Sequence, residues 1–156
     1  MTIAASPSGG SGGGILVGSR ARYTIGDTPS EAYLFAQDVI TFALPARVAA
    51  DIGLDIVQAH CVAASSEFNS YAIKRYRLPI QAWGQDIVQK LAFRAAYSAM
   101  RQRGFSYEEN RALTDGYKDA ERWMENVRDY KINPDVTEST PIVNTPQVVS
   151  DPLRGW

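Results

Sequence analysis

Residues 54–76, LDIVQAHCVAASSEFNSYAIKRY, decide the fold class of this chain of 156 residues. Apolar side chains recur along them at intervals of three and four, at positions 54, 57, 61, 64, 68, 71 or 72, and 76. This spacing is the period of an α-helix, and at ~1.5 Å per residue such a helix is about 35 Å long. The stretch therefore predicts a long helix in a mainly α protein.

Two further long helices complete a small helical bundle. Residues 86–103 form the second, which closes at Gly104, and its four alanines would let another helix approach closely. The third begins at Ser106, where Glu109 completes a capping box, and an apolar stripe runs along it. The residues of this stripe are Leu113, Tyr117, Ala120, Met124 and Val127. We expect the second helix at the centre of the bundle and the stripe of the third against a partner helix.

Two short helices are expected before the long ones. Residues 28–31 fit a capping box, and residues 33–35 fit equally well an extended lead-in to a short helix over residues 37–43. We favour the short helix with its extended lead-in. Pro45 then restarts the chain, and a helix of one or two turns reaches Asp51.

The two ends of the chain differ in composition from the core over residues 33–133. Residues 1–32 open with MTIAASPSGGSGGG, which predicts a flexible arm, and continue with a possible short hairpin or an extended segment over residues 15–26. Residues 134–156 contain four prolines and no helical period, which predicts an extended tail. Its large apolar side chains are unusual for a solvated linker and predict a docking segment that orders only against a partner. They are Ile142, Val143, Val148, Val149, Leu153 and Trp156.

Composition and charge fit one globular domain. The chain is 45% hydrophobic and 21% charged, and its net charge is −1. A single cysteine, Cys61, excludes an intrachain disulfide. No apolar run approaches the ~20 residues that cross a bilayer, and the N-terminus lacks the pattern of a signal peptide. We expect a protein made in the cytoplasm, without a membrane partner.

The sequence offers no pattern typical of catalysis, metal binding or a cofactor. His60 and Cys61 are the only residues of their types, and neighbours on a helix point about 100° apart, so we expect no shared metal and a buried or boundary histidine. Carboxylates of the third helix alternate with Arg and Lys at distances of three and four, which predicts a solvated, salt-bridged face. No nucleophile or nucleotide motif is present. We predict that the protein is not an enzyme.

Charge is segregated along the chain. Residues 23–70 carry six acids against one arginine, and residues 71–104 carry seven bases against one aspartate. Two groups stand out, one at the end of the first long helix and one along a single face of the second. They are Lys74, Arg75 and Arg77, and then Lys90, Arg94, Tyr97 and Arg101. Such groups can cap a helix, face solvent, or contact a polyanion or an acidic neighbouring subunit.

Two short motifs flank the alanine-rich second helix. The first is Tyr71-x-x-x-Arg75-Tyr76-x-Leu78-Pro79-Ile80 and the second is Tyr117-x-Asp119-Ala120-x-x-Trp123-Met124. Together they make residues 33–133 resemble the bacteriophage head-completion proteins of the Mu-like kind, which are related in fold to the adaptors of long-tailed phages and gene transfer agents. The resemblance assigns the following as family motif residues: Tyr71, Tyr76, Leu78, Pro79, Tyr117 and Trp123.

The resemblance implies a structural virion protein that forms a ring, by analogy twelve-fold, between portal and tail at the capsid vertex. Its partners would be copies of itself, the portal protein and a tail or stopper protein, while DNA passes through the channel without sequence-specific binding. A ring sets one face of each subunit against a different face of the next, and segregated charge supplies both. We therefore expect both cation groups at a subunit interface, with the face of Lys90, Arg94 and Arg101 against acids between residues 27 and 67 of the neighbouring subunit. A DNA-binding regulatory protein is the alternative, against which the net charge of −1 argues.

Overall fold

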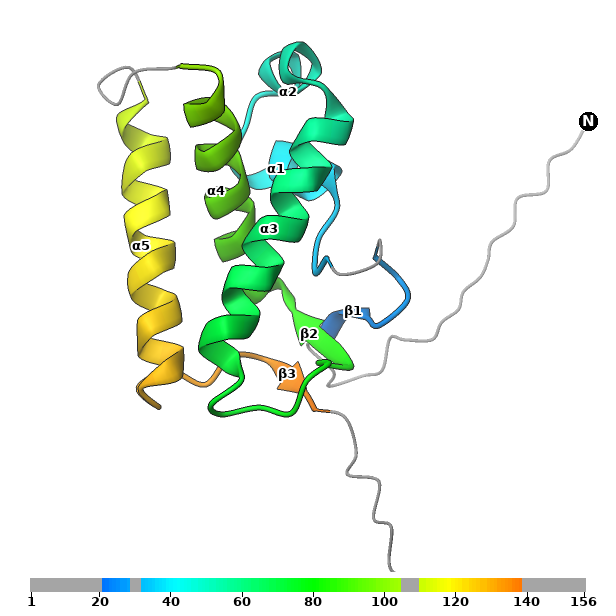
Figure 1. Ribbon diagram of the computed structural model, residues 1–156, viewed down its shortest axis with the longest axis vertical. Helices are drawn as coiled ribbons and strands as arrows, with labels where there is room; N and C mark the ends of the chain where they lie inside the picture. Colours follow the sequence, from blue (N-terminus) through cyan, green and yellow to red (C-terminus); the bar gives the residue numbers. More distant parts are fainter. Residues whose placement is uncertain (1–20, 29–31, 105–109, 139–156) are drawn as a thin grey trace, which may run out of the picture.

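The computed structural model describes residues 21–28, 32–104 and 110–138 as five helices and three short strands (Figure 1). In chain order these are β1 (Ala21–Thr24), α1 (Ala36–Phe42), α2 (Ala46–Ile52), α3 (Leu54–Ala72), β2 (Ala82–Gly84), α4 (Gln85–Gln102), α5 (Arg111–Arg128) and β3 (Val136–Thr137). The prediction of a mainly α small bundle is confirmed. The capping box at residues 28–31, the start of a helix at Ser106 and the apolar residues of the tail from Ile142 lie wholly or partly outside the described residues.

The predicted helices are present with small changes at their ends. The first long one is α3, which ends at Ala72 in a tightened turn, where the Arg75 amide donates to the Ala72 carbonyl three residues back at 2.8 Å. The second is α4, and Gly104 follows it with a φ of 81°, the left-handed conformation that glycine adopts readily after a helix. Both short helices, α1 and α2, are also confirmed.

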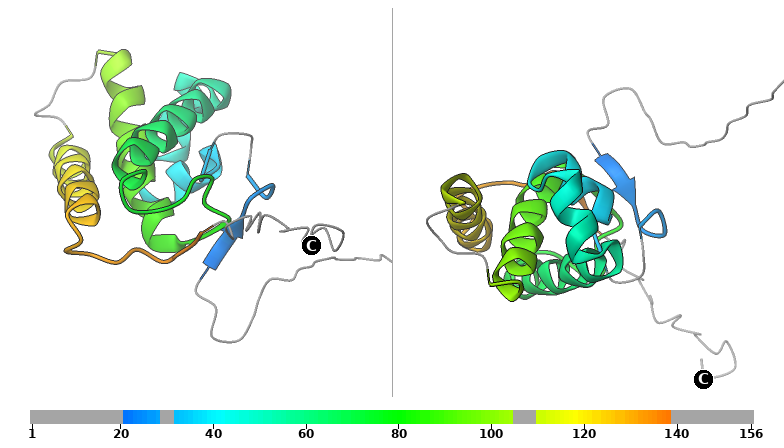
Figure 2. Two further views of the ribbon diagram at one scale, coloured as in Figure 1. Left: turned by 60° about the horizontal axis from the view of Figure 1, so that its bottom comes forward. Right: turned by 90° about the horizontal axis from the view of Figure 1, so that it is seen from above.

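The alanine-rich helix α4 lies at the centre, as predicted. It packs against α1, α3 and α5, and its four alanines at 92, 95, 96 and 99 are completely buried (Figures 1 and 2). Gly116 on α5 faces it so closely that a Cβ built there would lie 2.4 Å from a ring carbon of Phe93. Small side chains on α4 and a missing side chain on α5 thus let three helices approach one another.

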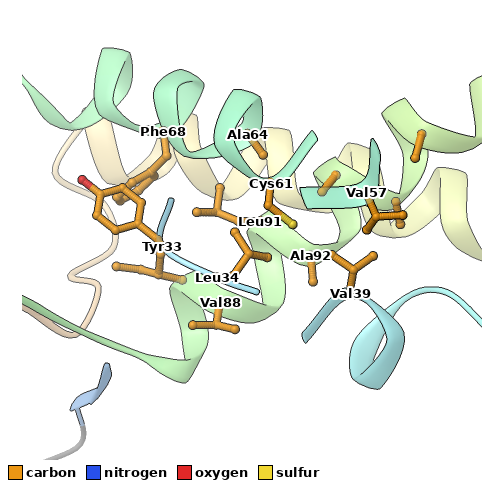
Figure 3. Close-up of a cluster of buried hydrophobic side chains, with 14 of the residues drawn as sticks. Tyr33, Leu34, Val39, Val57, Cys61, Ala64, Phe68, Val88, Leu91 and Ala92 are labelled. Atoms are coloured by element: carbon orange, nitrogen blue, oxygen red, sulfur yellow. The ribbon is translucent and has the colours of Figure 1, made fainter. Parts of the chain in front are cut away.

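The core also takes side chains from the extended lead-in before α1. Tyr33 and Leu34 point between α3 and α4, where Figure 3 shows them among Cys61, Phe68 and Leu91. Leu34 is completely buried although it belongs to no helix. Burial of its side chain contributes roughly 1.5 to 3 kcal/mol, which explains why this lead-in is ordered.

A three-stranded antiparallel sheet, ordered β1-β2-β3, was not predicted. Ala21 pairs with Gly84, and Trp83 pairs with Val136, so the central strand joins segments that are far apart in the sequence. The described part of residues 15–26 is therefore extended, and its partner is β2. Trp83 ties the sheet to the helices, because its Nε1 donates to the Tyr33 carbonyl at 2.7 Å and its ring meets that of Tyr33 edge to face.

Membrane-span criteria pick out no single helix in the described part of the chain. The pair α2 and α3 passes the same test of length and composition only when the two are taken together, and they are bent by 95° at the break between them.

Candidate assembly surface

The basic turn after α3 divides into one cation that holds the fold and two that face solvent. Arg75 Nη1 donates to the carbonyls of Val127 at 2.8 Å and of Ile132 at 2.5 Å, and Nη2 donates to the side chain of Asn133. Its guanidinium also lies 4.9 Å from the ring centroid of Tyr130. Arg75 thus ties the turn after α3 to backbone carbonyls at and beyond the end of α5.

Lys74 and Arg77 are the cations of this turn whose side chains are exposed. No ion pair holds either of them within the described residues. The Arg77 backbone amide donates to Glu138 Oε2 at 3.1 Å, which places the start of the C-terminal segment beside the turn. Contact of Lys74 and Arg77 with a neighbouring subunit stays a prediction.

The predicted basic face of α4 points largely into the subunit. Lys90 forms an ion pair with Asp119 of α5, and Arg94 forms one with Glu67 of α3. The Arg94 guanidinium also lies 4.4 Å from the ring centroid of Tyr117, which stacks on Tyr97 at 4.0 Å. This cluster closes the seam where α3, α4 and α5 meet.

The expectation that these four residues form one surface is wrong for Arg94. Its side chain is only 8% exposed, because α5 covers the face of α4 on which it lies. A charge reversal at Arg94 would therefore act on the fold of the subunit. Arg101, one helical turn beyond Tyr97, is exposed, and its contact with a neighbour stays a prediction.

The carboxylates of α5 also differ from the prediction of a face paired along one helix. Asp119 pairs with Lys90, and Glu121 Oε1 lies 4.0 Å from Arg94 Nη1, so both reach across to α4. The pattern missed this because spacing along one helix does not show which charges a second helix brings near. The available signal was that the neighbouring helices carry acids, Glu67 and Asp119, that can pair with the basic stripe on α4.

The family motif residues other than Tyr117, which stacks on Tyr97 of α4, lie where α3 ends and α5 packs on it. The Arg128 guanidinium lies 5.7 Å from the centroid of the Tyr71 ring, and that of Arg75 lies 5.0 Å from the centroid of the Tyr76 ring. Trp123 is 9% exposed and stacks on Phe68 with 5.9 Å between centroids. Leu78 is half-buried, Pro79 is exposed and the bond between them is cis.

Large apolar side chains are exposed at both ends of α3. At its start, Leu54 is 53% and Ile56 40% exposed; beyond its end, Ile73 is 64% exposed, and Tyr130, after α5, is 67% exposed. We call the first region, with the two exposed aspartates beside it, the acidic corner. It consists of Asp51, Leu54, Asp55 and Ile56. We call the second the basic end. It consists of Ile73, Lys74, Tyr130 and Lys131.

An open groove of about 890 Å³ lies between α3 and the sheet. Ala59, Val62 and Ala63 form its helical wall, and Ile25 and Pro79 line it from the sheet side. Its lining is largely apolar with a few polar groups, among them Asn69, which accepts a hydrogen bond from the Tyr33 hydroxyl. Shape and lining suit an extended apolar segment rather than a charged substrate.

Buried titratable groups of the core are structural. Burial raises the pKa of Tyr33 to about 12, although its hydrogen bond to Asn69 acts the other way. Burial also raises the pKa of Cys61 to about 12, so this thiol stays neutral. His60 lies at the core boundary, as expected, where its Nε2 is 2.7 Å from Gln102 Oε1. In the part of the chain that the structure describes, no three His, Cys, Asp or Glu side chains are grouped to hold a metal ion.

A family model described as Bacteriophage Mu, Gp36 matches residues 32–150. The chain belongs to this family. Membership makes it a bacteriophage protein of the structural or assembly class and confirms the Mu-like part of the resemblance. The Gp36 match begins with the lead-in to α1 and continues past β3 into the segment that contains Ile142 and Val149, beyond the range on which the resemblance was based. Comparison with curated proteins gave no match.

Proposed function

We propose that this Gp36-family protein is a head–tail connector adaptor, a structural virion subunit that forms a ring between portal and tail at the capsid vertex. The observation that carries the proposal is the family match over residues 32–150, which includes every described helix. The small α-helical fold supports it, because a rigid bundle offers several surfaces to different neighbours. The protein acts by binding, and its partners are other copies of itself, the portal and a tail or stopper protein.

The arrangement of charge supports a connector over a DNA-binding regulator. A regulator would need cations free to contact phosphates. Lys90 is instead paired with Asp119, and Arg94 with Glu67, within the subunit, so of the two predicted cation groups only Lys74, Arg77 and Arg101 are exposed. DNA would pass such a ring without being read. Twelve-fold symmetry follows from the resemblance and is part of the proposal.

Loss of the protein from its phage tests this role. We expect a phage with a stop codon early in the gene to produce DNA-filled heads and free tails that do not join, as seen by electron microscopy of lysates. Addition of the purified protein should restore joining. A normal yield of tailed particles without the protein would overturn the proposal, and a change in phage transcription with normal joining would favour the regulator.

A further inference from the structure

The acidic corner and the basic end lie at opposite ends of one long helix. The nineteen residues of α3 separate them by roughly 28 Å at ~1.5 Å per residue, and Figure 1 shows the start of α3 beside α2 at the top and the ends of α3 and α5 at the bottom. Each end exposes two large apolar side chains. Among the described residues only one other large apolar side chain, that of Ile25, is comparably exposed.

Two aspartates, Asp51 and Asp55, flank the apolar pair of the acidic corner. Gly53 turns α2 into α3 with a φ of 105°, and a Cβ built on it would lie 3.0 Å from Asp55 Oδ1 and 3.7 Å from the end of the Ile56 side chain. Asp51 lies at the end of α2, where its carbonyl, not its carboxylate, accepts a hydrogen bond from Arg103. The described residues provide neither carboxylate with an ion pair. Arg47 is the exposed cation of α2.

Lysines surround the apolar pair of the basic end. The Tyr130 hydroxyl lies 3.4 Å from the Lys74 carbonyl, which brings Tyr130 beside Ile73. Hydrogen bonding to Arg128 lowers the pKa of Asp129, and the charges of Lys131 and Lys74 contribute, so these cations lie close together in space. Tyr130 has a φ of 62°, a left-handed conformation that costs an ordinary residue energy. This conformation closes the C-terminus of α5, where the Lys131 amide donates to the Asn126 carbonyl at 2.8 Å, and the Tyr130 ring is left exposed.

We propose that the acidic corner of one copy of this chain binds the basic end of the next. Apolar side chains meet at the centre of this contact, and opposite charges surround them, as in many specific protein interfaces. The contact joins two different surfaces, so repetition produces a ring when the rotation closes. The inference rests on the proposed ring and adds which surfaces form it. This contact takes the place of the one predicted for the α4 face around Arg94, because α5 covers that face within the subunit.

Two variants with reversed charges test the contact. One carries Asp51→Lys and Asp55→Lys, and the other carries Lys74→Glu and Lys131→Glu. Each alone places like charges against each other, so we expect association to weaken about tenfold or more. Mixed together, they can alternate around a ring with every contact complementary, and assembly should return. Native mass spectrometry and negative-stain microscopy of the full chain over a concentration series, alone and with purified portal protein, measure this.

Arg122→Glu is the matched control, because it reverses an exposed charge in the middle of α5 and should assemble like the wild type. All variants should fold, with melting temperatures within a few degrees of the wild type, the largest shift coming from the loss of the Asp55 carboxylate in the first turn of α3. If the wild type forms rings and each variant alone assembles equally well, or if the mixture of variants does not assemble, this interface is overturned while the proposed ring stands. A wild-type chain that stays monomeric under every condition overturns both. Unchanged assembly with loss of salt-sensitive duplex DNA binding in the Lys74→Glu, Lys131→Glu variant would assign the basic end to DNA and overturn the contact.

Discussion

The seam around Arg94 and the two ends of α3 use the same kinds of side chain in opposite ways. Both contain charges next to aromatic or aliphatic groups. In the seam, Arg94 has Glu67 as its ion-pair partner and the Tyr117 ring beside it, and α5 covers them. At the ends of α3, Leu54 and Ile73 are more than half exposed, and no ion pair within the described residues involves Asp55 or Lys74.

This difference separates residues that stabilise the subunit from residues that are exposed and carry the proposed contact. A charge partnered and covered within the chain contributes to folding and is not accessible to a neighbour. An exposed charge beside an apolar side chain adds little to folding but can direct assembly. Substitutions in the seam should therefore lower stability, and substitutions at the ends should change association alone.

The largest expected effect compares two aromatic residues of α5 and the turn after it. Trp123→Ala should lower the free energy of unfolding by roughly 3 to 5 kcal/mol, because the indole is buried against Phe68. Tyr130→Ala, in an exposed ring, should cost less than about 1 kcal/mol. Urea denaturation of the two proteins measures both. Equal losses would erase the distinction between seam and ends.

The next effect concerns Arg94. Arg94→Leu leaves Glu67 without its partner, and we expect a loss of about 1 to 3 kcal/mol, less than for a fully buried pair because Glu67 is one-third exposed. Arg101→Leu, two turns further along α4 and exposed, should change stability by less than about 0.5 kcal/mol. Thermal unfolding of both variants decides it, and a neutral Arg94→Leu would show that the covered ion pair does not hold the seam.

Helices α4 and α5 approach so closely at Gly116 that the position should not accept a side chain. Gly116→Ala gains about 1 kcal/mol of helix propensity, but its Cβ would overlap the Phe93 ring, at a cost of about 1 to 3 kcal/mol. We expect a net loss of about 1 kcal/mol by denaturation. In a chain that carries Phe93→Ala, Gly116→Ala should no longer lower stability. Additive losses would contradict a direct contact between the two positions.

The sequence predicted the helices better than the sheet for a physical reason. The apolar period repeats over five turns in α3, so one irregular position does not hide it. The strands have four, three and two residues, and their pairing joins Ala21, Trp83 and Val136 across long separations. Three residues cannot show an alternating pattern, so local patterns did not reveal β2.

The candidate site was predicted in part. Lys74 and Arg77 are exposed, as a contact surface requires, because the chain leaves α3 there. Arg94 and Tyr97 lie on one face of α4, as their spacing indicated, but that face is covered by α5. Which face a neighbour covers depends on the packing of whole helices. The exposure of Tyr130 likewise depends on how α5 ends, for which its sequence gave no signal.

Alkaline pH should destabilise the core, because the buried Cys61 thiol resists ionisation. Cys61 ionises near pH 9 in the unfolded chain and near pH 12 in the folded one, so the folded state keeps a proton that the unfolded state loses. Stability present below pH 9 should fall by about 1.4 kcal/mol per pH unit above it. Urea denaturation between pH 8 and 11 measures this slope. Cys61→Ala should flatten it below pH 10, where Tyr33 does not yet contribute, and an unchanged slope would contradict the assignment.

The smallest effect on stability is expected from the C-terminal segment. Deletion of residues 140–156 should leave the melting temperature nearly unchanged, because ordering these residues costs roughly 1 to 2 kcal/mol each and their six large apolar side chains return less. Assembly should fail nonetheless, with heads that do not retain the protein or join tails. A large drop in melting temperature, or infectious particles made with the truncated chain, would contradict a docking role.

Imaging of the neck of purified phage particles by electron cryo-microscopy tests the central claim most directly. We expect a ring of this chain between portal and tail. In it, the acidic corner at the start of α3 in each subunit should contact the basic end of a neighbour. Density for the five helices should identify the subunit. Particles that join heads to tails without this protein at the neck would contradict the account.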